Sequence, residues 1–106
     1  MEITSPPFSI TPLALQHAVE IYQHKSIPPQ YALRIGIKGA VGCSGINYVI
    51  GFDLQKTGDV AFQMEELTVV MEKRQALYLA GVVVDWLDLP AQRGFSFSRG
   101  NEALVQ

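Results

Sequence analysis

The sequence predicts an α+β fold with a mainly antiparallel or mixed β-sheet. One early segment repeats its apolar residues at helical spacing, whereas most later segments repeat theirs at every second residue. The resulting order is a helix, several strands, a short helix and further strands. A doubly wound parallel sheet would instead need strands and helices in regular alternation. No repeat, low-complexity tract or linker divides the chain, so we expect one domain over residues 1–106.

The first predicted element is a helix over about residues 12–25. Thr11 suits the N-cap position, and Pro12 suits the first helical position because its φ is already helical. The Pro28-Pro29 pair ends the helix and favours an extended chain after it. The apolar stripe of the helix comprises Leu15, Ala18, Val19 and Tyr22, and the opposite polar side comprises Gln16, His17, Glu20, Gln23 and His24.

Two neighbouring strands are predicted next, over residues 31–38 and 46–54. Both alternate apolar residues with others, and a short glycine-bearing connection joins them, so we expect them in one sheet. The shared apolar faces are Tyr31, Leu33, Ile35 and Ile37 in the first strand, and Ile46, Tyr48, Ile50, Phe52 and Leu54 in the second. We interpret Tyr48 and Phe52 as core residues, and Arg34 and Lys38 as residues that keep the opposite face soluble.

The remaining elements are shorter. Further strands are expected at 60–65, 67–71, 82–89 and 94–98, with a turn at 55–59 and a short helix within 72–81 that Gly81 closes. Trp86, in the strand at 82–89, is interpreted as core or interface packing rather than as a cofactor contact.

Composition limits the classes of function. The chain is 48% hydrophobic and 17% charged, its net charge is −2 and it shows no basic patch, so we expect no nucleic-acid partner. A single cysteine excludes an intrachain disulfide framework and is typical of a reducing compartment. The N-terminus lacks the pattern of a signal peptide, and the longest apolar run, at 79–84, is too short to cross a membrane. We therefore expect a soluble, cytoplasmic protein.

The one cysteine lies in residues 36–48, GIKGAVGCSGINY, between the first two predicted strands. Gly39, Gly42 and Gly45 accept positive φ at little cost, and successive backbone N–H groups in such a turn favour negative charge. They would stabilise the thiolate of Cys43, which is the form that binds metals and attacks electrophiles. The alternative is a buried structural cysteine, which behaves as a small apolar residue.

Residues of this chain alone do not complete a site around Cys43. A metal such as zinc needs four ligands, commonly close-spaced cysteines and histidines, and an iron–sulfur cluster also needs about four. The only histidines, His17 and His24, lie on the polar side of the first helix and are interpreted as solvated. Nucleophilic catalysis by Cys43 would need a base, and the sequence places none.

Residues 33–53, LRIGIKGAVGCSGINYVIGFD, resemble the central motif of the A-type iron–sulfur carriers, the HesB/IscA-like proteins. In that family a strand enters a G-C-S-G turn, and the next strand carries an aromatic residue where Tyr48 stands. The resemblance extends to SITPLALQHAVEIYQ at 9–23, to LTVVMEKRQALYLAGVVVDWLD at 67–88 and to RGFSFS at 93–98. It covers about Phe8 to Phe97, which is most of the chain.

The resemblance implies a fold of two small packed mixed sheets with short helices, assembling as a homodimer or tetramer. It also implies iron or iron–sulfur cluster binding through three cysteines, one in the G-C-S-G turn and two in a C-G-C pair of the C-terminal tail. Only Cys43 carries over, because after Phe97 the printed chain reads SRGNEALVQ, without the family's N-P or its C-G-C pair. The candidate cofactor-binding residues are Gly42, Cys43, Ser44 and Gly45, with Cys43 as the metal ligand.

The expected function is therefore that of a non-enzymatic carrier or scaffold for an iron–sulfur cluster or iron. In a two-fold dimer, Cys43 of each subunit would contribute one thiolate. External thiols such as glutathione, or residues of a recipient protein, would contribute the rest. The expected partners are iron–sulfur assembly or recipient proteins. Two alternatives remain open. One is a divergent member that has lost metal binding and acts as a binding partner or regulator of iron–sulfur assembly, and the other is an enzyme with Cys43 as its nucleophile.

Overall fold

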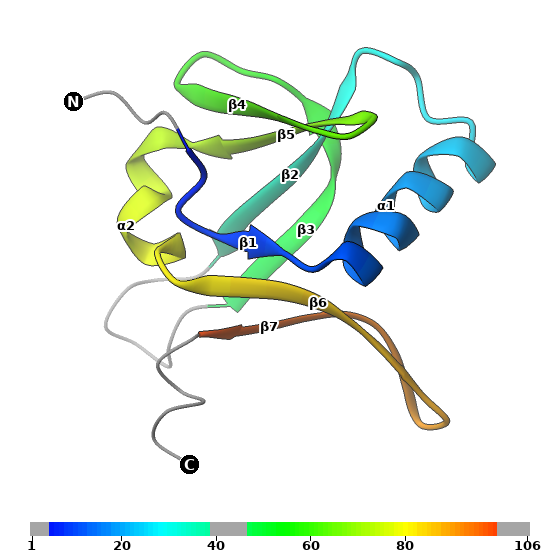
Figure 1. The fold of residues 1–106 in the computed structure, drawn as a ribbon. Coiled ribbons are helices and arrows are strands. Elements are labelled where there is room, and N and C mark those ends of the chain that lie inside the picture. The colour runs from blue at the N-terminus through cyan, green and yellow to red at the C-terminus, as the bar shows by residue number, and fades with distance from the viewer. Residues whose placement is uncertain (1–4, 39–46, 100–106) are drawn as a thin grey trace.

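The computed structural model of the chain describes residues 5–38 and 47–99 (Figure 1). In chain order the elements are β1 (Ser9–Ile10), α1 (Pro12–His24), β2 (Tyr31–Lys38), β3 (Asn47–Leu54), β4 (Asp59–Met64), β5 (Leu67–Glu72), a 3₁₀ turn η1 (Lys73–Gln75), α2 (Ala76–Leu79), β6 (Val82–Leu89) and β7 (Gln92–Arg99).

The strands form two mixed sheets, which agrees with the predicted α+β fold. The larger has four strands in the order β3-β2-β5-β4, and the smaller has three in the order β1-β6-β7. Within each sheet one pair is parallel, β2 with β5 and β1 with β6, and the other pairs are antiparallel. The smaller sheet and α1 lie on the same side of the larger sheet (Figure 1).

Strands β2 and β3 pair in one continuous antiparallel register. The pairing runs from Tyr31 opposite Leu54 to Lys38 opposite Asn47. Leu33, Ile35 and Ile37 face Phe52, Ile50 and Tyr48, respectively, in cross-strand pairs. These six residues belong to the hydrophobic core or pack against it. The predicted pairing of these strands is therefore confirmed over the described residues, and Ile46 lies outside them.

The core lies between the two sheets and takes residues from most elements. Its most deeply buried side chains are all aliphatic or methionine: Leu33, Ile35, Leu67, Met71, Leu79, Val69, Val70, Val82 and Val84. Helix α1 contributes Ala14, Leu15 and Ala18, and Tyr22 packs against the cluster from the same helix. Tyr48 and Phe52 pack against the core while staying partly exposed, consistent with their interpretation.

The N-cap of α1 also ties the helix to the smaller sheet. The Thr11 hydroxyl accepts a hydrogen bond from the Ala14 amide at 3.1 Å and donates one to Asp85 Oδ1 at 2.8 Å. The bond from Thr11, and a second from the Trp86 amide, lower the pKa of Asp85 below its ordinary value. The predicted cap is confirmed, and its link to β6 is a tertiary contact that local pattern does not encode.

The second helical segment is less regular than the sequence predicts. Instead of one short helix, residues 73–79 form a 3₁₀ turn followed by one turn of α-helix. Gly81 then adopts a φ of +79°, the left-handed conformation expected of a glycine that closes a helix. No helix within the described ranges combines the length and apolar character needed to cross a membrane.

Candidate functional site

The predicted site residues Gly42, Cys43, Ser44 and Gly45 lie outside the described residues. The base of their segment is described, because β2 ends at Lys38 and β3 begins at Asn47, and these two residues are paired across the sheet. Cys43 precedes Asn47 by four residues in the sequence. The dimensions of the chain therefore keep their Cα atoms within about 14 Å of each other.

The base of the Cys43 segment, defined by Lys38 and Asn47, also meets the end of β7. The ring of Tyr48 stacks on Phe97, with centroids 5.4 Å apart and planes at 22°. Arg99 donates a hydrogen bond from Nε to the Tyr48 hydroxyl at 3.1 Å. The larger sheet and the smaller sheet are thus joined at the point where β3 leaves the Cys43 segment.

On the side of β2 that faces β5, the end of the strand is held by a side chain rather than by strand pairing. Parallel pairing with β5 reaches only Leu33 and Arg34, so it does not extend to the end of β2. There the amide of Ile37 donates to Gln75 Oε1 at 3.1 Å. A Cβ at Gly36 would come within 3.0 Å of the same oxygen, so a glycine leaves room for this contact.

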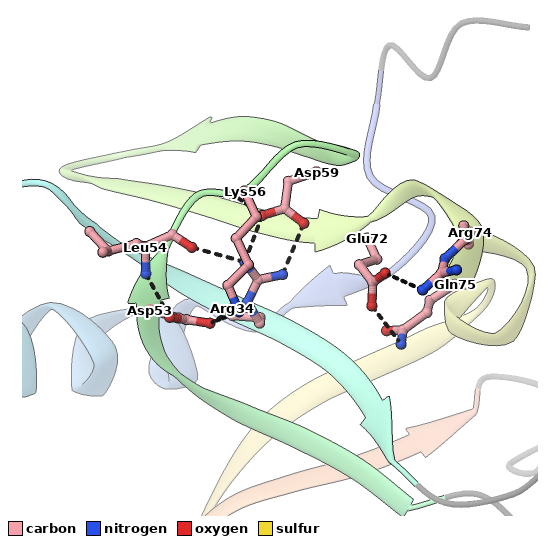
Figure 2. Close-up of polar contacts among 8 residues, drawn as sticks. All are labelled: Arg34, Asp53, Leu54, Lys56, Asp59, Glu72, Arg74 and Gln75. Carbon is pink, nitrogen blue, oxygen red and sulfur yellow. Dashed lines mark hydrogen bonds and ion pairs between the residues drawn. The ribbon is translucent and has the colours of Figure 1, made fainter.

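Gln75 is itself held in place by a neighbouring carboxylate. Its Nε2 donates to Glu72 Oε2 at 3.2 Å, while Arg74 pairs with the other oxygen of Glu72 at 2.8 Å (Figure 2). The end of β5 and the turn η1 therefore replace the missing strand pairing beside β2.

Gln75→Ala is expected to loosen the end of β2 that leads into the Cys43 segment. The Ile37 amide would lose its acceptor, so its hydrogen exchange should accelerate by about tenfold. The control is Gln63→Ala, since Gln63 bonds only within the β4–β5 turn region. Amide exchange measured by NMR should change at Ile37 in the first variant and not in the second. Unchanged exchange in Gln75→Ala would contradict this role.

The described residues do not complete a metal site by themselves. No group of three or more His, Cys, Asp or Glu side chains within 5–38 and 47–99 is arranged to hold a metal ion.

The interpretation of His17 as a solvated residue holds only in part, because its side chain is 30% exposed. Its ring stacks on Trp86 with centroids 3.9 Å apart and planes at 6°, and Trp86 also meets Phe95 edge-on at 5.0 Å. The helix periodicity places His17 on the polar side of the helix, but this side meets β6 at Trp86. His24 is exposed, as expected, and Trp86 packs against the core, as expected.

Comparison with known proteins shows to which family this chain belongs. The chain is 31% identical over 104 residues to the iron–sulfur assembly protein IscA of the Arabidopsis thaliana chloroplast, covering 95% of this chain and 56% of that relative. It is 31% identical over 98 residues to a SufA protein of Bacillus subtilis, covering 92% of this chain and 80% of that relative. The chain belongs to the HesB/IscA/SufA family. The resemblance in the sequence is thereby confirmed, although no family model matches the chain.

The fold of this member of the IscA/SufA family matches that of a solved IscA structure. A crystal structure of IscA with a 2Fe–2S cluster superposes with a TM-score of 0.69 at 24% identity, covering 89% of this chain and 86% of the other. This likeness confirms the predicted arrangement of two mixed sheets with an N-terminal helix and a short second helix.

This IscA/SufA-family chain also contains an ion-pair cluster that sequence reasoning missed, formed by Arg34, Asp53 and Asp59. Arg34 contacts Asp59 through two hydrogen bonds, the shorter 2.6 Å, and Asp53 through a third at 3.0 Å (Figure 2). The Arg34 side chain is 17% exposed and that of Asp59 only 1%. The interpretation of Arg34 as a solubilising residue is therefore wrong, whereas Lys38 is exposed as expected. Asp59 follows the turn residue Gly58, but no local sequence pattern identifies Arg34 as its partner.

Proposed function

We propose that this protein is a carrier or scaffold that receives and passes on an iron–sulfur cluster, or iron, as its cargo. Family membership supports the proposal, because one relative is named an iron–sulfur assembly protein and a solved IscA holds a 2Fe–2S cluster. The single observation that carries it is Cys43 in a G-C-S-G sequence between two strands, β2 and β3, that the fold pairs.

The ligand count makes the cargo site a shared one in this proposal. The 106 residues contain one cysteine, whereas a 2Fe–2S cluster takes four ligands. Two copies of Cys43 across a two-fold subunit interface would supply two thiolates, and external thiols or a recipient protein would supply two. Such a site is open on one side, so it suits transfer better than storage. Residues 1–106 would act as one cytoplasmic domain, with assembly or recipient proteins as partners.

Cluster binding is expected to depend on both oligomerisation and added thiol. The protein would be reconstituted anaerobically with iron and sulfide, with and without glutathione, and followed by visible absorbance and sedimentation. A brown, dimeric or tetrameric species should form in the presence of the thiol and fade without it. A cluster that is stable in a monomer without added thiol would contradict this ligation.

The second candidate is a member of the family that regulates assembly without carrying metal. The observation that favours it is the single cysteine among these 106 residues. In that case the protein would stay colourless under every reconstitution condition and still bind purified iron–sulfur assembly proteins.

A further inference from the structure

Strand β3 is the outermost strand of the larger sheet (Figure 1). On one side it pairs with β2 along all of Asn47–Leu54, and the register has no interruption. Among residues 5–38 and 47–99, no strand pairs with its other side, which we call the outer edge of β3. A long and regular edge strand presents a row of unpaired backbone N–H and C=O groups, so a further strand can be added there.

Strand β3 lacks the features that usually prevent such pairing. Proteins protect edge strands with proline, lysine, bulges or a very short length. The eight residues of β3 include no proline and no lysine. Its one charged residue, Asp53, already pairs with Arg34 at 3.0 Å and with Lys56 at 3.3 Å. By contrast, β1 at an edge of the smaller sheet has only two residues.

The hydrophobic core is incompletely covered along β3. On β2, Leu33 and Ile35 are 1% and 0% exposed. The residues opposite them on β3, Phe52 and Ile50, face the same core but are only half-buried, and so is Tyr48. A strand added at the outer edge would remove part of this apolar surface from water, and that burial favours association.

The outer face of β3 contains an open cavity of about 250 Å³, lined by Arg34 and residues 49–53. A Cβ at Gly51 would meet no atom within 4 Å, so the space above this glycine is empty. In a sheet, the side chain directly opposite a residue on the next strand lies on the same face. A side chain opposite Gly51 on an added strand would therefore reach this cavity.

We propose that a second copy of this chain occupies the outer edge, with the two β3 strands pairing antiparallel about a two-fold axis at Ile50. In this register Ile50 meets Ile50 of the other copy at the axis. Each Val49 then lies opposite Gly51 of the other copy and fills the cavity beside it. Moving the axis to Gly51 would place the two glycines together and leave the cavity empty.

The other residues of β3 also match in this register. Each Tyr48 lies opposite Phe52 of the other copy, and aromatic pairs stabilise neighbouring strands. Each Asn47 lies opposite Asp53, so a polar amide faces the carboxylate and no like charges face each other. The strand is thus complementary to itself, as a two-fold interface requires. This self-complementarity favours a second copy over an unrelated partner.

The inference goes beyond the proposed function and does not depend on Cys43. In an antiparallel pair about Ile50, the two Asn47 residues are about 20 Å apart, because six residues separate Asn47 from its partner position at 3.4 Å each. We therefore expect the interface that shares the cluster to be a different one. Both interfaces together would build a tetramer.

The test measures the association of the metal-free, reduced protein by analytical ultracentrifugation over a wide concentration range. Gly51→Lys places a bulky cation opposite Val49 in both copies, so it should raise the dissociation constant about tenfold or more. The matched control is Ala61→Lys. Ala61 is exposed on the edge strand β4, in the same row across the sheet as Gly51, and its variant should associate like the wild type.

The ultracentrifugation also gives the outcomes that would overturn the proposal. They are a wild type that stays monomeric at every concentration, and equal dissociation constants for the wild type and Gly51→Lys. The Cys43→Ser variant should associate as tightly as the wild type even though it is expected to bind no cluster. Loss of association in Cys43→Ser would overturn the inference, whereas failure of the wild type to bind a cluster would overturn only the carrier function.

Hydrogen exchange on the wild type identifies what occupies the outer edge and needs no variant. Backbone amides of β3 should become protected as the protein concentration rises, while those of β4 should not change. Protection of β3 that is the same at every concentration would show that another segment of the same chain covers the edge. Protection that appears only with an added assembly protein would assign the edge to that partner. Either result would overturn the proposal.

A distance measurement tests the register. Leu54 is 45% exposed at the end of β3, so a spin label can be attached there through Leu54→Cys in the Cys43→Ser background. With the axis at Ile50, eight residues separate Leu54 from its partner position, which places the two Cα atoms about 27 Å apart. Pulsed electron paramagnetic resonance should give a separation of about 20–35 Å, allowing for the label. A separation outside this range would overturn the proposed pairing.

Discussion

Replacing Cys43 with serine is expected to reduce iron and sulfide incorporation to background while changing the free energy of unfolding by no more than about 0.5 kcal/mol. The reason is that the thiolate would be the ligand that this chain contributes, and an alcohol binds iron poorly at neutral pH. The measurement is metal and sulfide content after anaerobic reconstitution, together with the melting temperature of the metal-free protein.

The opposite interpretation of Cys43, as a buried apolar residue, makes the reverse prediction for Cys43→Ser. It expects a clear fall in melting temperature and no change in metal content, because the polar hydroxyl would be buried. Ser98→Ala, at an exposed position of β7, is a suitable control and should change neither quantity. Destabilisation without loss of metal would remove the main support for the carrier function.

Asp59→Asn is expected to cause a large loss of stability, about 2–4 kcal/mol. Both Asp59 oxygens accept from Arg34, and one also accepts from the Lys56 amide at 2.7 Å. With the Asp59 side chain only 1% exposed, an amide in its place leaves part of the Arg34 charge uncompensated in a partly buried setting. Urea denaturation of the two proteins measures this difference.

The same carboxylate should make stability depend on pH in the acid range. The Arg34 hydrogen bond, aided by the Lys56 amide, lowers the pKa of Asp59 below its ordinary value of 3.8. A lowered pKa means that the stabilisation is complete above the pKa of the unfolded chain and is lost as pH falls through that of the folded protein. The stability difference between wild type and Asp59→Asn should therefore be constant above about pH 5 and shrink at lower pH.

Asp88→Asn provides a matched control for both measurements. Asp88 pairs with Arg93 at 2.7 Å, but both side chains are more than half exposed, at 63% and 71%. Exposed pairs contribute little, so this variant should unfold like the wild type at every pH. Equal destabilisation by the Asp59 and Asp88 variants would contradict a special role for the partly buried cluster.

The sequence by itself predicted most of the helices and strands of this protein, but not the short strand β1. Thr11-Pro12 and the apolar spacing after it predicted α1 to within a residue, because a cap and a helical period are local properties. The alternation in β2 and β3 likewise predicted most of the side chains that enter the core, although Leu54, on the predicted apolar face, is 45% exposed. Family resemblance supplied the two-sheet architecture and Cys43 as the candidate ligand, although Cys43 lies outside the described residues.

Only the tertiary structure decided which of these segments meet. The parallel pairings of β1 with β6 and of β2 with β5 join strands that are not consecutive, and alternation alone does not specify a partner. The stacking of His17 on Trp86 depends on α1 crossing β6, and the contact of Arg99 with Tyr48 joins residues 51 positions apart. Local patterns specify the face that a residue occupies, whereas the partner of a charged or aromatic side chain is set by how the sheets and helices pack together.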